Sequence, residues 1–238
     1  MSERTTGQDL AQSGGQRLSG TVTALEVQVR DQSRVNLYLD GRFAFGLSAK
    51  SVADAGLKRG DHLGPDRIAD LLKGEAREQA MFQAFNYLSY RGRSTHEMQQ
   101  YLRKKGHAPE TIDSVVTRLV DLHYLDDTHF AVSWVENRRR AGGRGPHLLR
   151  SELLQKGVAR DTAEQATEDA AGEQHETALE AARKKATGLR AADYVEFSRK
   201  LGGYLSRRGF SSEVVWETVK RVWKEREDGV AAEDDDVA

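Results

Sequence analysis

Apolar and polar positions alternate with a period of two between residues 19 and 47, as they do in β-strands. The apolar positions form three sets, each on one face of a predicted strand: Leu25, Val27 and Val29; Val35, Leu37 and Leu39; Phe43, Phe45 and Leu47. Asp40-Gly41 lies between the last two sets and is the signature of a type I′ hairpin turn. A lone hairpin is marginal in water. We therefore expect a small β-rich domain over residues 19–65, with a short helix ending at Gly56 and a return strand near His62-Leu63.

From about Asp66 onward the apolar period changes to three and four residues, which indicates amphipathic helices. Residues 66–77 are expected to be a linker and the start of the first helix. Capping signals then mark helix ends. They are Ser94 with Glu97 and Asp161 with Glu164 as capping boxes, Asp126-Asp127 as a cap, Pro109 as a first helical residue and Gly106 as a stop.

A basic residue followed by glycine recurs at intervals of about 50 residues, at Lys105-Gly106, Lys156-Gly157 and Arg208-Gly209. Two apolar columns align with these glycines: Met98, Leu149 and Leu201; Leu102, Leu153 and Leu205. A period of this length holds three helices of about four turns each. We therefore predict a mainly α protein, in which three tandem three-helix-bundle repeats form an elongated, curved array after the β-hairpin domain. The expected repeats span 78–125, 126–175 and 176–225, with disordered tails at 1–18 and, acidic in character, at 226–238.

Positive charge is concentrated locally although the formal net charge of the chain is only −1. The segment RRRAGGRGPHLLR, residues 138–150, has five arginines and no carboxylate. The candidate binding residues are Arg138, Arg139, Arg140, Arg144, Arg150, Lys156, Arg103, Lys104, Lys105, Arg207 and Arg208. Two interpretations stay open. The cations either stabilise helix C-termini or bind phosphates or carboxylates of a partner.

Signatures of catalysis are missing from the sequence. There is no cysteine, and neither a phosphate-binding glycine loop nor an H-E-x-x-H pair occurs. The seven histidines are scattered, so we predict no catalytic residue, metal site, cofactor or small-molecule substrate. No apolar run is long enough to span a bilayer, and a cytoplasmic location is expected. Trp134, Trp216 and Trp223 lie on apolar stripes and are expected in the core.

Residues 75–225 resemble RecX, the bacterial regulator of the RecA recombinase. The most specific segments are Tyr124-Leu125-Asp126-Asp127, Phe130-Ala131, the run from Arg138 to Gly145 with Pro146, and Leu153-Leu154-Gln155-Lys156-Gly157. The resemblance implies tandem three-helix repeats and no enzymatic activity. It implies binding to a RecA–single-stranded DNA filament, in its groove or at its growing end, which limits strand exchange, ATP hydrolysis and co-protease activity. It also implies a basic face at Arg138, Arg139, Arg140, Arg144, Arg150 and Lys156. The β domain lies outside the repeats, and only some members carry a similar one.

The alternative is an autonomous DNA-binding protein, such as a repressor with helix-turn-helix-like modules. Its recognition helices would be acidic at 109–122 and 161–174, which disfavours reading of duplex sequence. Contact with single-stranded DNA, and weak contact with duplex DNA, stays open.

Overall fold

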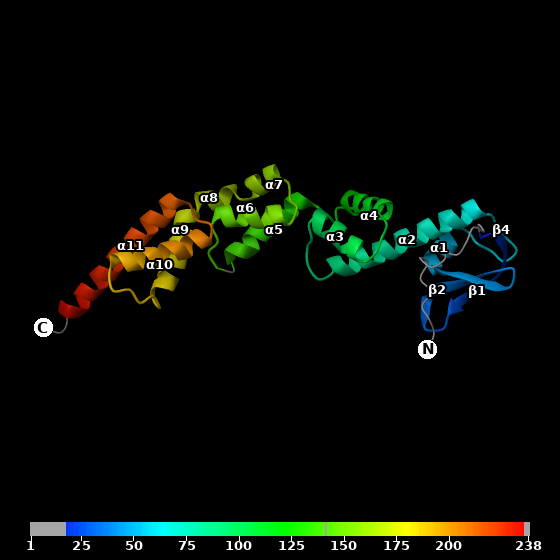
Figure 1. Cartoon of the computed structure of the whole chain (residues 1–238), viewed down its shortest axis with the longest axis horizontal. Coiled ribbons are helices and arrows are strands. Elements are labelled where there is room, and N and C mark those ends of the chain that lie inside the picture. Colours follow the sequence, from blue (N-terminus) through cyan, green and yellow to red (C-terminus); the bar gives the residue numbers. More distant parts are fainter. Residues whose placement is uncertain (1–17, 141, 236–238) are drawn as a thin grey trace. The chain divides into compact units, whose positions relative to one another are not determined.

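The computed structural model describes residues 18–140 and 142–235, with only the backbone described for Arg140 and for residues 229–235. Apart from Leu18, the expected N-terminal tail lies outside the described residues. The chain forms two compact units. The first comprises the segment up to Arg91 together with Gln99–Asp121, and the second comprises Gly92–Met98 and the segment from Leu122 onward. The expected mainly helical fold with an N-terminal sheet is confirmed (Figure 1).

The first unit begins with a four-stranded antiparallel sheet of order β3-β2-β1-β4. Its elements are β1 (Gly20–Gln28), β2 (Asp31–Leu39), β3 (Arg42–Ser48), α1 (Ala49–Asp54) and β4 (His62–Leu63). Asp40 and Gly41 have φ angles of 48° and 77°, which are the left-handed values that a type I′ turn requires. The expected hairpin, short helix and return strand are therefore confirmed.

The predicted strand faces are only partly right. Leu37 pairs with Phe45, but Tyr38 pairs with Phe43, so Ala44 is an extra residue in β3. This bulge turns Phe43 to the opposite face, where its side chain is exposed, whereas Phe45 and Leu47 stay in the core. Val27 lies at a second irregularity of β1 and is also exposed, and Val29 follows the end of the strand.

A single helix, α2 (Pro65–Leu88), connects the sheet to the first repeat (Figure 1). It passes without interruption through the expected linker and contributes Ile68 and Leu71 to the core beneath the sheet. Pro65 at its first position suits a helix start, because proline has no N–H to leave unpaired there. Its C-terminal part belongs to the first repeat with α3 (Thr95–Lys104) and α4 (Pro109–Asp121), and α4 packs against α2.

The second unit contains the helices of the second and third repeats. They are α5 (Asp127–Arg140), α6 (Pro146–Gln155), α7 (Arg160–Ala166), α8 (Glu168–Gly172), α9 (Gln174–Ala186), α10 (Tyr194–Arg207) and α11 (Ser212–Asp235). Asp126 caps α5 as expected, because its carboxylate accepts the N–H groups of Thr128 and His129. The alanine-rich segment after α6 is divided at buried Thr167, whose hydroxyl donates to the carbonyl of Ala163.

Three expectations for the second unit are wrong. The capping box of Asp161 and Glu164 does not form, because α7 already begins at Arg160 and its N-cap is Ala159. Helix α11 continues to Asp235, so residues 226–235 are helical and not a disordered tail. Trp216 is 60% exposed on α11, whereas Trp134 and Trp223 pack against the cores as expected.

Candidate functional site: the basic junctions between repeats

Two basic turns of the second unit have the same backbone structure. Gly157 and Gly209 follow the middle helices of their repeats with φ angles of 76° and 83°. Each glycine N–H bonds to the carbonyl three residues earlier, and the next N–H bonds to the carbonyl five residues earlier. This left-handed helix stop leaves the preceding basic residue, Lys156 or Arg208, at the tip of the turn.

Each turn packs on the start of the middle helix of the preceding repeat. Ser94, the N-cap of α3, donates its hydroxyl to the carbonyl of Lys156 at 2.6 Å. At the next junction the N–H of Gly145 donates to the carbonyl of Arg208 at 2.8 Å. A Cβ atom on Gly157 would overlap the side chain of His96, and one on Gly209 would overlap Leu148. Glycine is therefore required for close approach as well as for the turn.

The side chains at the tips hold the repeats together. Lys156 Nζ lies 2.8 Å from Glu97 Oε1 and 4.4 Å from the ring centre of Trp134. The guanidinium of Arg208 donates to the carbonyls of Gly142 and Gly143, in the loop between α5 and α6. Lys156 and Arg208, two of the expected binding residues, thus make structural contacts at the junctions.

Glu152 on α6 contacts three neighbouring side chains. Its carboxylate accepts a hydrogen bond from Trp134 Nε1 at 2.9 Å, pairs with Arg144, and lies 3.4 Å from Arg138 Nε. The guanidinium of Arg138 also lies 4.2 Å from the ring centre of Trp134, a cation–π distance. We call Arg138, Arg144, Arg208, Glu152 and Trp134 the arginine cluster.

The arginine cluster is positively charged and only partly exposed. Burial lowers the pKa of Arg144, and the charges of Arg138 and Arg208 lower it further. Arg144 nevertheless stays protonated, because arginine loses its proton only at extreme pH. Two guanidinium groups, those of Arg138 and Arg144, share the one carboxylate of Glu152, which leaves an excess of one positive charge at this contact. The side chains of Arg138 and Arg144 are about one-third exposed, so they can still contact a partner.

The other predicted residues are distributed differently. Arg139 pairs with Glu173, and Arg150 lies 3.9 Å from Glu164. The expectation that the arginines of segment 138–150 are unpaired is therefore wrong for Arg138, Arg139, Arg144 and Arg150, because acids from outside the segment reach them. Four predicted residues are exposed: Arg103, Lys104, Lys105 and Arg207. The side chain of Arg140 lies outside the described residues.

A cleft of about 890 Å³ lies beside Gly142 and Gly143. Its charged lining residues are Glu136, Glu173, Glu176, Glu180, Arg139, Lys184, Lys185 and Arg208. This even mixture of signs is typical of a polar protein surface and does not favour a pocket for one anion. Within the described ranges, no group of three or more His, Cys, Asp or Glu residues is placed to hold a metal ion. In the same part of the chain, no helix is both long and apolar enough to cross a membrane.

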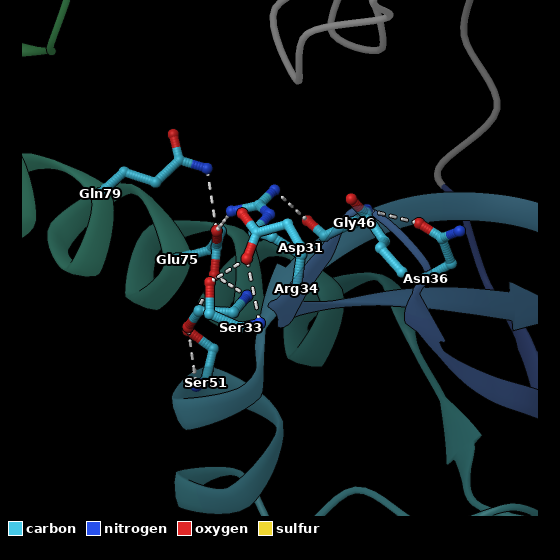
Figure 2. Close-up of polar contacts among 10 residues, drawn as sticks. Asp31, Ser33, Arg34, Asn36, Gly46, Ser51, Glu75 and Gln79 are labelled. Carbon is cyan, nitrogen blue, oxygen red and sulfur yellow. Dashed lines mark hydrogen bonds and ion pairs between the residues drawn. The ribbon is translucent and has the colours of Figure 1, made fainter.

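Sequence reasoning missed two carboxylates. Glu152 lies two residues beyond the arginine-rich segment, and that proximity was the available signal. Glu75 interrupts the apolar stripe of α2, four residues after Leu71 and seven after Ile68, and it is buried. Figure 2 shows that Glu75 binds Arg34 and Ser51, and it also accepts the N–H of Ser48. Glu75 thereby fastens α2 to the sheet and to α1.

Comparison with known families gives four consecutive matches. Residues 20–64 match the regulatory protein RecX N-terminal domain. Residues 80–119, 126–166 and 172–219 match the first, second and third three-helix domains of RecX. The matched segments include both the sheet and the basic junctions described above.

Curated relatives and solved structures agree with these matches. The regulatory protein RecX of Bacillus subtilis is 30% identical over 213 residues, which are 89% of this chain and 81% of that protein. The RecX protein of Lactobacillus johnsonii is 39% identical over 140 residues, which span 59% of this chain and 51% of that protein. A crystal structure of regulatory protein RecX matches with a TM-score of 0.67 and 25% identity, over 86% of this chain and all of that one. The crystal structure of RecX from Lactobacillus salivarius gives a TM-score of 0.57 at 25% identity, over 62% of this chain and 97% of that one.

Proposed function

Because this chain belongs to the RecX family of regulatory proteins, we propose that it is a non-enzymatic negative regulator of the RecA recombinase. It binds the RecA–single-stranded DNA filament and limits ATP hydrolysis, strand exchange and co-protease activity. The filament offers both phosphates and protein carboxylates to a basic surface. Direct contact with single-stranded DNA contributes to the binding, and contact with duplex DNA is weak.

The arginine cluster is the observation that carries this proposal. Trp134 and Glu152 hold Arg138 and Arg144 in place before any partner arrives. Ordered side chains lose less conformational entropy on binding than mobile ones. Their excess positive charge then favours an anionic surface. Such a cluster suits a polymer, on which several modest contacts add up.

The mixed charge of the neighbouring cleft favours the filament over naked DNA. Four carboxylates and four cations line the cleft, so a bare phosphate backbone would meet repulsion as well as attraction there. A protein filament supplies cationic side chains for those carboxylates as well as acids for the arginines. The same argument gives no support to an autonomous repressor that reads duplex DNA.

Filament ATP hydrolysis measured with and without the protein is the primary test. We expect the hydrolysis rate to fall as the protein is added, and binding to the filament to exceed binding to naked single-stranded DNA at moderate salt. Hydrolysis that is unchanged at saturating protein would refute the proposal. Equal affinity for filament and naked DNA would favour the autonomous DNA-binding alternative.

A matched pair of variants tests the role of the arginine cluster. The double variant Arg138→Gln/Arg144→Gln removes two charges, and we expect about tenfold weaker inhibition. Arg183→Gln is the control, because Arg183, like Arg138 and Arg144, pairs with a carboxylate, that of Glu225, but is more exposed and lies outside the cluster. Circular dichroism checks that all variants keep their helices. If the double variant inhibits as strongly as Arg183→Gln and the unmodified protein, the cluster has only a structural role.

A further inference from the structure

The basic turn of the first repeat has the same structure as the two turns that form the junctions. Gly106 has a φ angle of 86°, its N–H bonds to the carbonyl of Arg103, and the N–H of His107 bonds to the carbonyl of Leu102. These are the hydrogen bonds found at Gly157 and Gly209. Figure 1 shows this turn between α3 and α4.

The surroundings of this turn differ from those of the other two. A Cβ atom on Gly106 would meet nothing within 4 Å, whereas one on Gly157 or Gly209 would overlap the preceding repeat. Arg103, Lys104, Lys105 and Gly106 are all exposed. The turn at Gly106 thus has the backbone structure of the two docked turns. Within the described chain, however, no preceding repeat packs on it.

The two docked turns indicate what such a turn binds. At both junctions the bound element is the start of a helix that donates hydrogen bonds to backbone carbonyls of the turn. The donors are the hydroxyl of Ser94 at one junction and the N–H groups of Gly145 and His147 at the other. At the first junction the basic tip also pairs with an acid in the first turn of that helix, since Lys156 binds Glu97.

We propose that the turn of residues 103–107 binds the N-terminus of an α-helix on a protein partner. The helix carries a hydrogen-bond donor at its N-cap, such as serine or a glycine N–H, and a carboxylate in its first turn. This inference rests on the proposed function, which makes the partner a protomer of the recombinase filament. The turn supplies carbonyl acceptors, and Lys105 supplies the charge, as Lys156 does within the chain.

The chemistry of the turn argues against a phosphate as the occupant. Phosphate oxygens carry no hydrogen to donate to the backbone carbonyls that the docked turns use. A second copy of this chain does offer a helix start of the required kind, since Ser211 precedes α11 and Glu213 lies in the first turn of that helix. The identity of the crosslinked chain therefore distinguishes a second copy from a recombinase protomer.

Site-specific photocrosslinking tests the inference, because the chain has no cysteine and a single one can be introduced. Lys105→Cys would carry a benzophenone and be mixed with RecA–single-stranded DNA filaments. Lys58→Cys is the control, an exposed lysine in another turn of the same unit. We expect a crosslink to RecA from position 105 but not from position 58. The crosslinked RecA peptide should begin a helix with an acid in its first turn.

A charge reversal gives a second readout. Lys105→Glu should raise the concentration needed for half-inhibition by about tenfold, and Lys58→Glu should leave it unchanged. Crosslinks to DNA or to a second copy of the chain would overturn the inference in favour of that occupant. Full inhibition without a crosslink, and without an effect of Lys105→Glu, would overturn the inference but leave the proposed function standing. If the unmodified protein fails to inhibit, the proposed function itself falls.

Discussion

At Glu75, one buried carboxylate joins the sheet of the first unit to helix α2. Burial alone would raise the pKa of Glu75, but the N–H of Ser48, the side chains of Gln79 and Ser51, and the charge of Arg34 favour the ionised form. These bonds outweigh the burial, so the pKa lies below the ordinary glutamate value. The ionised carboxylate therefore stabilises the folded sheet.

This lowered pKa predicts how the stability of the first unit depends on pH. The stabilisation is fully present above the ordinary glutamate pKa of about 4.3 and is lost as the pH falls through the lowered folded value. Glu75→Gln should cost about 1–3 kcal/mol at pH 7, because Arg34 loses its charged partner, and its deficit should shrink in acid. Thermal loss of the amide NMR signals of β2 and β3 measures this, with exposed Asp70→Asn as the control. A deficit that stays constant down to pH 3 would contradict the mechanism.

The limits of sequence reasoning are clearest for single side chains. The sequence correctly identified a concentration of arginines, but it could not show that Glu152, on another helix, pairs with Arg138 and Arg144. Such pairs depend on how helices pack, which a linear pattern does not encode. Phe43 was placed on the wrong face for a similar reason, because one inserted residue in β3 reverses the alternation.

Among the helices, the middle helix of each repeat was the most predictable. The capping box at Ser94 and Glu97 forms as expected, and all three glycine stops have left-handed φ angles. Local signals fix these ends, so the sequence suffices. It did not show that α10 has 14 residues where α3 and α6 have 10, about one extra turn. Phe197 therefore fills the first buried position of α10, and Leu201 fills the second.

The three glycine stops provide an internally controlled test of the junctions. Alanine at any of them must adopt a left-handed conformation, which costs about 1–2 kcal/mol. For Gly106→Ala we expect only that cost, because the site is open. Gly157→Ala and Gly209→Ala should lose about 1–3 kcal/mol more, because the added methyl group overlaps the preceding repeat. Urea unfolding measures the difference. Equal losses of unfolding free energy at all three positions would mean that the contacts at the two junctions add no stability.

For the molecule as a whole, a net charge of −1 conceals a basic surface whose strength depends on salt. Each cation that displaces a counterion from a nucleic-acid phosphate adds about one to the slope of log affinity against log salt. The family could be predicted from the sequence. The number of arginines available for phosphate contacts could not, because Glu152 and Glu173 on other parts of the fold pair with several of them.

The salt slope therefore separates phosphate contacts from contacts with protein. If Arg138 and Arg144 touch DNA in the filament, Arg138→Gln/Arg144→Gln should lower the slope of inhibition by about 1–2. Arg183→Gln, whose guanidinium pairs with Glu225, should leave the slope unchanged. Inhibition measured between 50 and 200 mM salt, roughly the range over which phosphate contacts weaken most visibly, provides the slope. Weaker inhibition by the double variant with an unchanged slope would place these arginines against recombinase carboxylates, because an isolated carboxylate, unlike the dense charge of a nucleic acid, holds few condensed counterions to release when it pairs.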